Sequence, residues 1–220
     1  MELITLGDNQ EEVLEKVKDA IRDGKIVAVP TDTVYGFIAD ATNNNAVKHM
    51  YALKQRPNEK AFPVFVRNIA MARWFAYISD TKMRFLEKIW PGSVTVIFHH
   101  KEKLPECVTA DHDTIAMRMP QSPLLLSLLD QINVPLVQSS ANISGVAPAT
   151  SAQAIVTSFE YQRQKPDLII DGGEVLGKPS TIINFTGNNP RMVRSGLVSK
   201  EEIDSLFVRL RETFEQVGKD

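Results

Sequence analysis

The chain has 220 residues, of which 43% are hydrophobic and 24% are charged, and its formal net charge is −2. This length and composition predict one globular domain, residues 1–220, with a sizeable buried core. The nearly balanced charge lacks the strong basic excess that is typical of proteins that bind long nucleic acids tightly.

Cysteine usage and the N-terminus predict the compartment. Cys107 is the only cysteine, so no internal disulfide can form and a reducing compartment is expected. We expect its thiol to be a small buried hydrophobe rather than a catalytic group. The N-terminus has no basic region followed by an apolar one, and no apolar stretch reaches about 18 residues. We therefore expect a cytoplasmic protein that does not contact membranes.

Hydrophobic spacing, caps and breakers predict interleaved helices and strands. In chain order they are helix 8–24, strand 26–30, helix 42–57, strand 62–66, helices 68–78 and 80–90, strands 93–98 and 113–120, helix 122–132, strand 134–142, strands 167–173, 180–186 and 191–196, and helix 199–216. The alternation is not a strict strand–helix–strand rhythm. It predicts an α/β (α+β-like) fold, with a twisted, mixed parallel and antiparallel sheet flanked by helices.

Two stretches carry further local signals. Ser199 and Glu202 form a capping-box pattern that begins the last helix. Its apolar stripe comprises Ile203, Leu206, Phe207, Leu210 and Phe214. The small, polar stretch 140–152 is expected to be a site loop between two strands rather than a linker.

Polar residues gather where predicted strands and helices end, which is where ligands bind in open α/β sheets. The stretch "PTDTVYGF" follows a buried strand with Thr31, Asp32, Thr33 and Tyr35, whose polar groups either bind a small ligand or cap nearby backbone. Lys54, Arg56 and Asn58 lie at the end of the second predicted helix. The two cations, Lys54 and Arg56, either clamp phosphate or simply complement the helix C-terminus.

Three later stretches add to this set. Thr114 and Arg118 share one face of a strand, which is either solvated or turned into a cleft. The loop with Ser139, Ser140 and Asn142 either binds an anion through its backbone N–H groups or makes a tight turn. The last stretch contributes Ser180, Thr181 and Arg194, and Arg194 could close over an anion.

Several common site motifs are absent from the sequence. The chain has no GxxxxGK[ST] phosphate loop and no GxGxxG fingerprint, which argues against P-loop and Rossmann sites. It has no CxxC, HxxxH or HExxH spacing for zinc. The GxSxG elbow of acyl-transfer hydrolases is also missing.

Taken together and in order, "PTDTVYGF", "KQRP", "TIAMRMP", "SSAN-SG", "DGG" and "STIINF" closely resemble the YrdC/TsaC family of L-threonylcarbamoyladenylate synthases. The resemblance runs from about residue 10 to about residue 210 and corresponds to the short form of the family. It implies a YrdC-like (DHBP synthase-like) fold with a concave cleft. It also implies a nucleotidyltransferase that converts L-threonine, bicarbonate or CO2, and ATP to threonylcarbamoyl-AMP and pyrophosphate.

The resemblance also implies partners and site residues. Partner proteins would pass the threonylcarbamoyl group to tRNA, with at most a weak tRNA contact by this chain. Mg2+ is expected with the ATP, without a protein metal site or an organic cofactor. The family signature, taken as catalytic, corresponds to Lys54, Arg56, Ser140 and Asn142. ATP binding is implied for these four together with Asn58, Thr114 and Arg194. Threonine binding is implied for Thr31, Arg118 and Ser180.

Three alternatives remain open from the sequence. The first is a YrdC-like protein that binds RNA or nucleotides without catalysis. The second is a carbamoyl-adenylate-forming domain like those in hydrogenase maturation factors, although the chain has no acylphosphatase or zinc-finger segment. The third is a divergent paralogue without activity, against which the intact signature counts.

Overall fold

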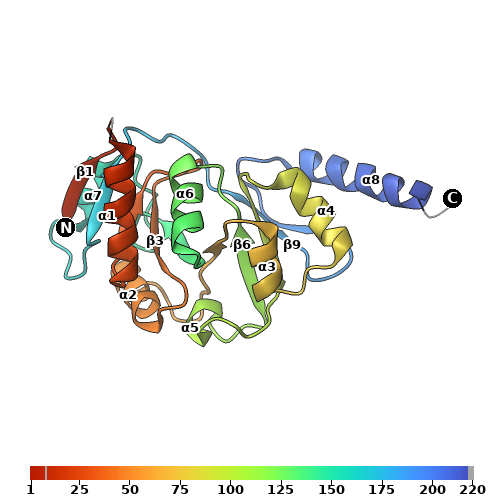
Figure 1. The fold of residues 1–220 in the computed structure, drawn as a ribbon, viewed down its shortest axis with the longest axis horizontal. Helices are drawn as coiled ribbons and strands as arrows, with labels where there is room; N and C mark the ends of the chain where they lie inside the picture. The colour runs from red at the N-terminus through yellow and green to blue at the C-terminus, as the bar shows by residue number, and fades with distance from the viewer. Residues whose placement is uncertain (8, 218–220) are drawn as a thin grey trace.

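The computed structural model describes residues 1–7 and 9–217, with side chains described up to residue 208. The helices and strands form one α/β body (Figure 1). In chain order the elements are β1 (Glu2–Thr5), α1 (Gln10–Arg22), β2 (Val27–Val29), β3 (Gly36–Asp40), α2 (Asn44–Lys54), β4 (Val64–Phe65), α3 (Ile69–Phe75), α4 (Asp80–Ile89), β5 (Val94–His99), α5 (Glu106–Thr109), β6 (Thr114–Arg118), α6 (Pro123–Ile132), β7 (Leu136–Ser140), α7 (Ala152–Phe159), β8 (Leu168–Asp171), β9 (Thr181–Asn184), β10 (Arg191–Arg194) and α8 (Lys200–Val217).

All of these strands belong to one sheet, in the order β1-β8-β2-β3-β7-β4-β6-β5-β9-β10. The sheet is mixed: β8 runs parallel to β1 and β2, whereas β3 runs antiparallel to β2 and β7. Further along, β4 is parallel to β6 and β5 is parallel to β9. The predicted mixed sheet is therefore confirmed.

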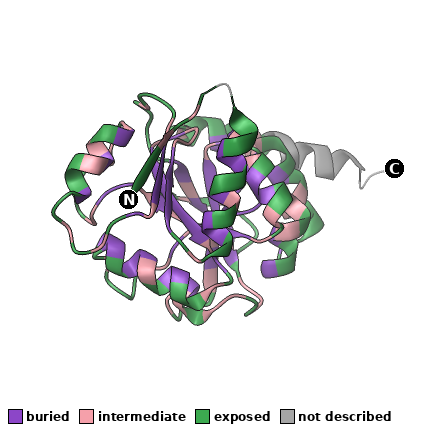
Figure 2. Ribbon diagram, turned by 60° about the vertical axis from the view of Figure 1, so that its left-hand side comes forward, coloured by how far each residue is buried: buried purple, intermediate pink, exposed green. Residues whose placement is uncertain are grey.

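Alternation along the strands divides the core between the two faces of the sheet. In β2, Val27 and Val29 join α1 and α6 in one apolar cluster, whereas Ala28 joins α2 and α7 in the other. This is the period of two that an extended backbone imposes on side chains. Purple, buried residues accordingly follow the strands in Figure 2, and green, exposed residues cover the outer faces of the helices. None of the helices in the described residues combines the length and hydrophobicity needed to span a bilayer.

Most predicted elements are present, with ends a few residues shorter. The capping box of the last helix is formed, since Glu202 N–H donates to Ser199 Oγ (3.2 Å) and Ser199 N–H donates to the Glu202 carboxylate (2.8 Å). From the predicted apolar stripe, Ile203 is buried and Phe207 packs against the core. The side chains of Leu210 and Phe214 lie outside the described residues.

Four elements were not predicted: β1, β3, α5 and α7. The expectation that strands flank the loop 140–152 is wrong, because the helix α7 follows it. Cys107 was expected to be buried, but it is only partly buried and donates a hydrogen bond to Asn44 Oδ1 (3.0 Å). Its neighbours therefore include a polar acceptor as well as apolar groups.

Candidate functional site

The loop after β2 connects strands that lie far apart in the sheet. Strand β6 lies four positions from β2, a separation of roughly 19 Å at the usual strand spacing. Arg118 at the end of β6 nevertheless forms an ion pair with Asp32, in the loop after β2. The loop after β2 and the long side chain of Arg118 together span this separation, and the site is built there.

The first polar cluster joins the two halves of the signature. Lys54, the last residue of α2, is buried, and its Nζ donates to Ser140 O (2.5 Å), Asn142 O (2.7 Å) and Asn142 Oδ1 (3.1 Å). Ser140 Oγ donates to the same Asn142 Oδ1. Asn142 Nδ2 donates to Ile143 O (2.9 Å) and to Val146 O. The three donors of one ammonium group thus hold the loop after β7 in a fixed conformation.

The pKa of this buried ammonium group is lower than usual. Burial, together with the smaller effect of the nearby positive charge of Arg56, lowers the pKa of Lys54 to about 7. Its acceptors in the cluster are two carbonyl oxygens and an amide oxygen, all of them neutral. When Lys54 is protonated, the cluster therefore carries a net positive charge.

The second cluster surrounds Arg118, which is 2% exposed. Its Nε donates to Gly92 O (2.8 Å), its Nη1 donates to Thr33 Oγ1 (3.1 Å), and its Nη2 meets Asp32 Oδ2. Burial lowers the pKa of the guanidinium, and the Asp32 charge opposes that effect. All three nitrogens therefore have protein partners, and the cation is compensated by a carboxylate.

Thr31 shapes the turn that carries Asp32. Thr31 Oγ1 accepts from the N–H groups of Thr33 (3.0 Å) and Val34 (3.2 Å) and donates to Val34 O (2.7 Å). Its methyl group lies against Gly36, where a Cβ would be 3.4 Å from Thr31 Cγ2 and 3.2 Å from Ser139 O. The side chain of Thr31 therefore links the Arg118 cluster to the end of β7.

The third cluster is formed by the start of β9 and the end of β10. Arg194 Nη2 donates to Ser180 O (2.8 Å), and Ser180 Oγ shares a hydrogen bond with Thr95 Oγ1 (2.9 Å). Ser93, two residues before Thr95, is hydrogen bonded to Asp32 Oδ2 (3.4 Å) and so connects this cluster to the second one. Burial lowers the pKa of Arg194.

The second and third clusters are joined through Asp32 and Ser93, and the first adjoins the second where Thr31 packs against Gly36, which pairs with Ser140; together the three clusters are called the polar chain. The structure brings most of the predicted site residues into this chain: Thr31, Lys54, Arg118, Ser140, Asn142, Ser180 and Arg194.

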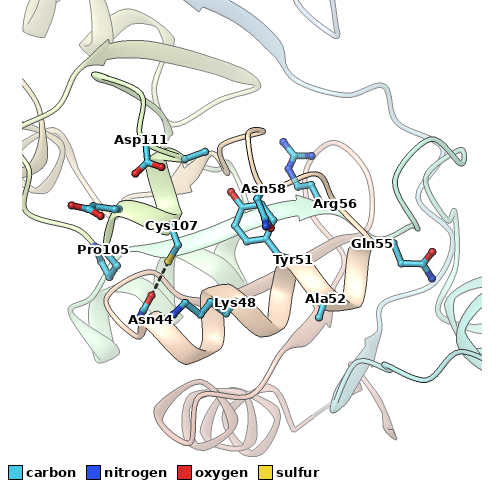
Figure 3. A pocket seen from close by; sticks show the side chains of 12 residues that line it. Asn44, Lys48, Tyr51, Ala52, Gln55, Arg56, Asn58, Pro105, Cys107 and Asp111 are labelled. Atoms are coloured by element: carbon cyan, nitrogen blue, oxygen red, sulfur yellow. Dashed lines mark hydrogen bonds between the residues drawn. The ribbon is translucent and has the colours of Figure 1, made fainter.

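Arg56, Asn58 and Thr114 lie apart from this chain. Arg56 and Asn58 line a cavity of about 920 Å³ between α2 and α5. In Figure 3, Arg56 and Gln55 lie toward one end of this cavity, and Asn44 and Cys107 lie at the other. Arg56 donates to Lys60 O and Ala61 O, both at 2.8 Å, and lies over the ring of Phe62. Thr114 pairs with His99 at the opposite end of β6 from Arg118.

The cations of the site differ in their counter-charges. Within the described part of the chain, Arg118 forms an ion pair, whereas Lys54, Arg56 and Arg194 form none. The acceptors of those three are neutral oxygens. The site therefore has one compensated cation, Arg118, and three that can attract an anion.

Sequence reasoning placed Asp32 and Thr33 in a polar stretch without giving them a role, and it did not single out Ser93 and Thr95. The available signals were local. An acid directly after a buried strand requires a partner when it is buried, and the alternation in β5 puts Ser93 and Thr95 on one face. Among the described residues, no group of three or more His, Cys, Asp or Glu side chains could hold a metal ion.

Comparison with known proteins agrees with this geometry. A family model described as "Telomere recombination", covering Sua5, YciO and YrdC, matches residues 19–196. A threonylcarbamoyl-AMP synthase of Pyrococcus abyssi is 35% identical over 87% of this chain and 56% of its own length. A putative threonylcarbamoyl-AMP synthase of Methanocaldococcus jannaschii is 34% identical over 89% of this chain and 91% of its own length. The chain therefore belongs to the Sua5/YciO/YrdC family.

Solved structures show the same fold. P. abyssi Sua5 complexed with L-threonine has a TM-score of 0.85 and 32% identity, and the match covers 93% of this chain and 60% of that one. Escherichia coli YciO, at 24% identity and a TM-score of 0.81, shares the fold. The chain spans little more than half the length of some relatives, such as the synthases of P. abyssi and Bacillus subtilis (56% and 54%).

Proposed function

We propose that this chain is a threonylcarbamoyl-AMP synthase that condenses L-threonine, bicarbonate or CO2, and ATP, with release of pyrophosphate. The product would feed the N6-threonylcarbamoyladenosine modification of tRNA. The observation that carries the proposal is the polar chain, in which the uncompensated cations Lys54 and Arg194 lie on either side of a charge-balanced Arg118–Asp32 pair. Family membership and the relatives' names support the same activity.

The uncompensated cations suit the nucleotide. A triphosphate carries several negative charges, and Lys and Arg neutralise phosphate oxygens through charge-assisted hydrogen bonds. Lys54, Arg56 and Arg194, together with Asn58, Thr114, Ser140 and Asn142, are the residues we assign to ATP. In this role Lys54 acts by its charge and by holding the loop of Ser140 and Asn142, because its three donors are already bound.

The balanced part suits the amino acid. Threonine is a zwitterion, so a site for it requires both signs of charge at short range. Thr31 and Ser180 offer hydroxyl groups, and Arg118 with Asp32 offers a fixed cation and a fixed anion. We assign threonine binding to Thr31 and Ser180 and, through the orientation of Asp32, to Arg118.

The chemistry requires positioning more than covalent catalysis. The neutral amine of threonine adds to CO2 and loses a proton, which gives a carbamate. A carbamate oxygen then attacks the α-phosphorus, and the bond to pyrophosphate breaks. Because the attacking carbamate is already anionic, orientation and charge neutralisation can lower the barrier without a protein nucleophile. Mg2+ would enter as part of the ATP substrate and neutralise phosphate charge.

The test is a product assay with the purified chain. Pyrophosphate should form from ATP only when L-threonine and bicarbonate are both present. Mass spectrometry with labelled bicarbonate should find the label in threonylcarbamoyl-AMP. ATP turnover that does not depend on threonine would contradict the proposal.

The same proposal extends to partners and location. Downstream proteins would take the product to tRNA, and we propose that this occurs in the cytoplasm. A protein that only binds RNA would instead show no product and an RNA affinity that falls steeply with salt.

A further inference from the structure

Asp32 uses only one of its two carboxylate oxygens. Oδ2 pairs with Arg118 Nη2 and accepts from Ser93 Oγ (3.4 Å), whereas Oδ1 is buried and has no hydrogen-bond partner. Among the described residues, the other buried side-chain atoms in this condition are Arg67 Nε and Ser144 Oγ. A buried charged oxygen without a donor is costly, so its presence beside a binding site requires an explanation.

The Arg118–Asp32 pair is fixed rather than exchangeable. Arg118 is 2% exposed, and its other two nitrogens donate to Gly92 O and Thr33 Oγ1. An incoming carboxylate would have to displace Asp32 from a buried ion pair, which is strongly unfavourable. Arg118 therefore holds Asp32 in one orientation and leaves Oδ1 as the free acceptor.

The surroundings of Asp32 have room for a small ligand. Thr31 and Asp32 line a cavity of about 360 Å³, whose wall also includes Gln121, Ser122 and Gly172. The wall combines these polar groups with apolar side chains, among them Leu6, Pro123 and Leu124, so it suits a small molecule that has both polar and apolar parts. A carboxylate oxygen in such a wall can only accept a hydrogen bond, so its partner must be an N–H or O–H donor.

We propose that Asp32 Oδ1 accepts a hydrogen bond from the amino nitrogen of the amino-acid substrate, with Arg118 acting as a positioning residue through Asp32. This inference rests on the proposed function. The amino group is favoured over the side-chain hydroxyl because the ammonium form complements the carboxylate charge. The nitrogen has two N–H groups as a neutral amine and still has one after it has become a carbamate, so the same hydrogen bond can persist through the reaction.

This contact has a consequence for the reaction geometry. The carbamate nitrogen has a single N–H, and that group points to Asp32 when the hydrogen bond is made. The carbamate oxygens then point away from Asp32. Asp32 thus sets the direction in which the carbamate faces, and it does so without taking part in a covalent step.

The substitution Asp32→Asn tests the contact. Arg118 needs an acceptor, so the amide oxygen of the new side chain should turn to Arg118 and its NH2 should take the place of Oδ1. A donor would then face the substrate nitrogen. The KM for threonine should rise about 10- to 100-fold, the range for losing a hydrogen bond to a charged group, with little change in the KM for ATP.

Asp40→Asn is the matched control, because Asp40 lies at the far end of β3 and accepts from Thr42 N–H and Thr42 Oγ (both 2.7 Å). It should leave both KM values unchanged. An unchanged threonine KM in Asp32→Asn, in an enzyme that makes product, would overturn this inference but not the proposed function. Absence of product from the wild type would instead overturn the proposed function.

Substrate analogues identify the atom that Asp32 contacts, and the comparison of threonine with its amine-free analogue uses the wild type alone. Calorimetry on the wild type should show that replacing the amino group of threonine by a hydroxyl weakens binding at least tenfold. L-2-Aminobutyrate, which lacks only the hydroxyl, should retain its sensitivity to Asp32→Asn. If the amine-free analogue binds the wild type as well as threonine does, or if 2-aminobutyrate binds both proteins equally, the inference is wrong.

Discussion

The Lys54 cluster and the Arg118 cluster are both built around a buried cation, but the two cations are bound by different kinds of acceptor. Lys54 binds two carbonyl oxygens and an amide oxygen, and its pKa falls to about 7. Arg118 binds a carboxylate together with a carbonyl and a hydroxyl oxygen. The first arrangement leaves a positive charge for a ligand to neutralise, and the second leaves none.

This difference is the basis on which we propose a ligand for each cluster. A region with unneutralised positive charge favours a polyanion such as a triphosphate. A region whose charges are already paired favours a ligand that is itself balanced, such as an amino acid. The substitutions below are designed to separate these two kinds of buried cation.

The largest expected effect is on stability, at Arg118. Arg118→Met leaves the Asp32 charge buried and unpaired, so the free energy of unfolding should fall by about 3–5 kcal/mol. Urea denaturation measures it. The matched control is Arg73→Met, which breaks the exposed Arg73–Asp80 pair (3.0 Å) and should cost about 0–1 kcal/mol. Equal losses in the two variants would show that the Arg118–Asp32 pair is not a fixed element.

The next effect is on turnover, at Lys54. Lys54→Met retains most of the buried volume but removes the charge and the three hydrogen bonds to the loop of Ser140 and Asn142. Pyrophosphate release should fall about 10²- to 10³-fold, the scale for losing one preorganised charge-stabilising group. Lys165→Met, an exposed change in the segment between α7 and β8, should leave turnover intact. A loss below tenfold in single-turnover assays would remove Lys54 from the nucleotide site.

The pH dependence sharpens the contrast further. The pKa of Lys54 is about 7 in the folded chain and near its ordinary 10.5 when unfolded. Between these values the unfolded chain binds more protons, so stability contributed through Lys54 rises with pH, by at most about 1.4 kcal/mol per pH unit. Affinity for ATP should move in the opposite direction, because the ammonium form is lost as pH rises through 7.

Denaturation and ATP titration between pH 6 and pH 9 measure both trends, with Lys54→Met as the reference that lacks them. If the stability of the wild type and of Lys54→Met changes with pH in parallel over this range, the lowered pKa of Lys54 does not contribute to the pH dependence of stability.

The smallest effect is expected at Arg194. Arg194→Lys keeps the charge but cannot reproduce the two contacts of the guanidinium with Ser180 O. The KM for ATP should rise about 2- to 10-fold, the scale of one neutral hydrogen bond, and the KM for threonine should stay the same. Arg191→Lys, an exposed change on the same strand, is the control. A change confined to the threonine KM would move Arg194 to the amino-acid side.

Much of the fold was predictable because its elements are locally encoded. The stripe of α1 and the capping box at Ser199 and Glu202 are signals within a few residues of each other. By contrast, β1 and α5 have four residues each, too few for a period to show. In β3, Gly36 and Asp40 at the two ends resemble loop residues, and only pairing with β2 and β7 makes the segment a strand.

The site was predictable as a set of residues but not as a set of contacts. The bond between Lys54 and the loop after β7 joins residues 86 and 88 positions apart, and the Arg118–Asp32 pair joins residues 86 positions apart. The first contact depends on the pairing of β3 with β7, and the second on the path of the loop after β2, and no local pattern specifies either. The family resemblance implied that Arg118 binds threonine, whereas in the structure each of its three guanidinium nitrogens has a protein partner, one of them Asp32.

The most direct test of this division is calorimetric titration of two variants with two ligands, a non-hydrolysable ATP analogue and L-threonine. Lys54→Met should weaken binding of the nucleotide and leave threonine binding unchanged. Arg118→Lys should weaken threonine binding and leave nucleotide binding unchanged. If both variants lose affinity for the same ligand and keep it for the other, the two clusters do not serve separate substrates.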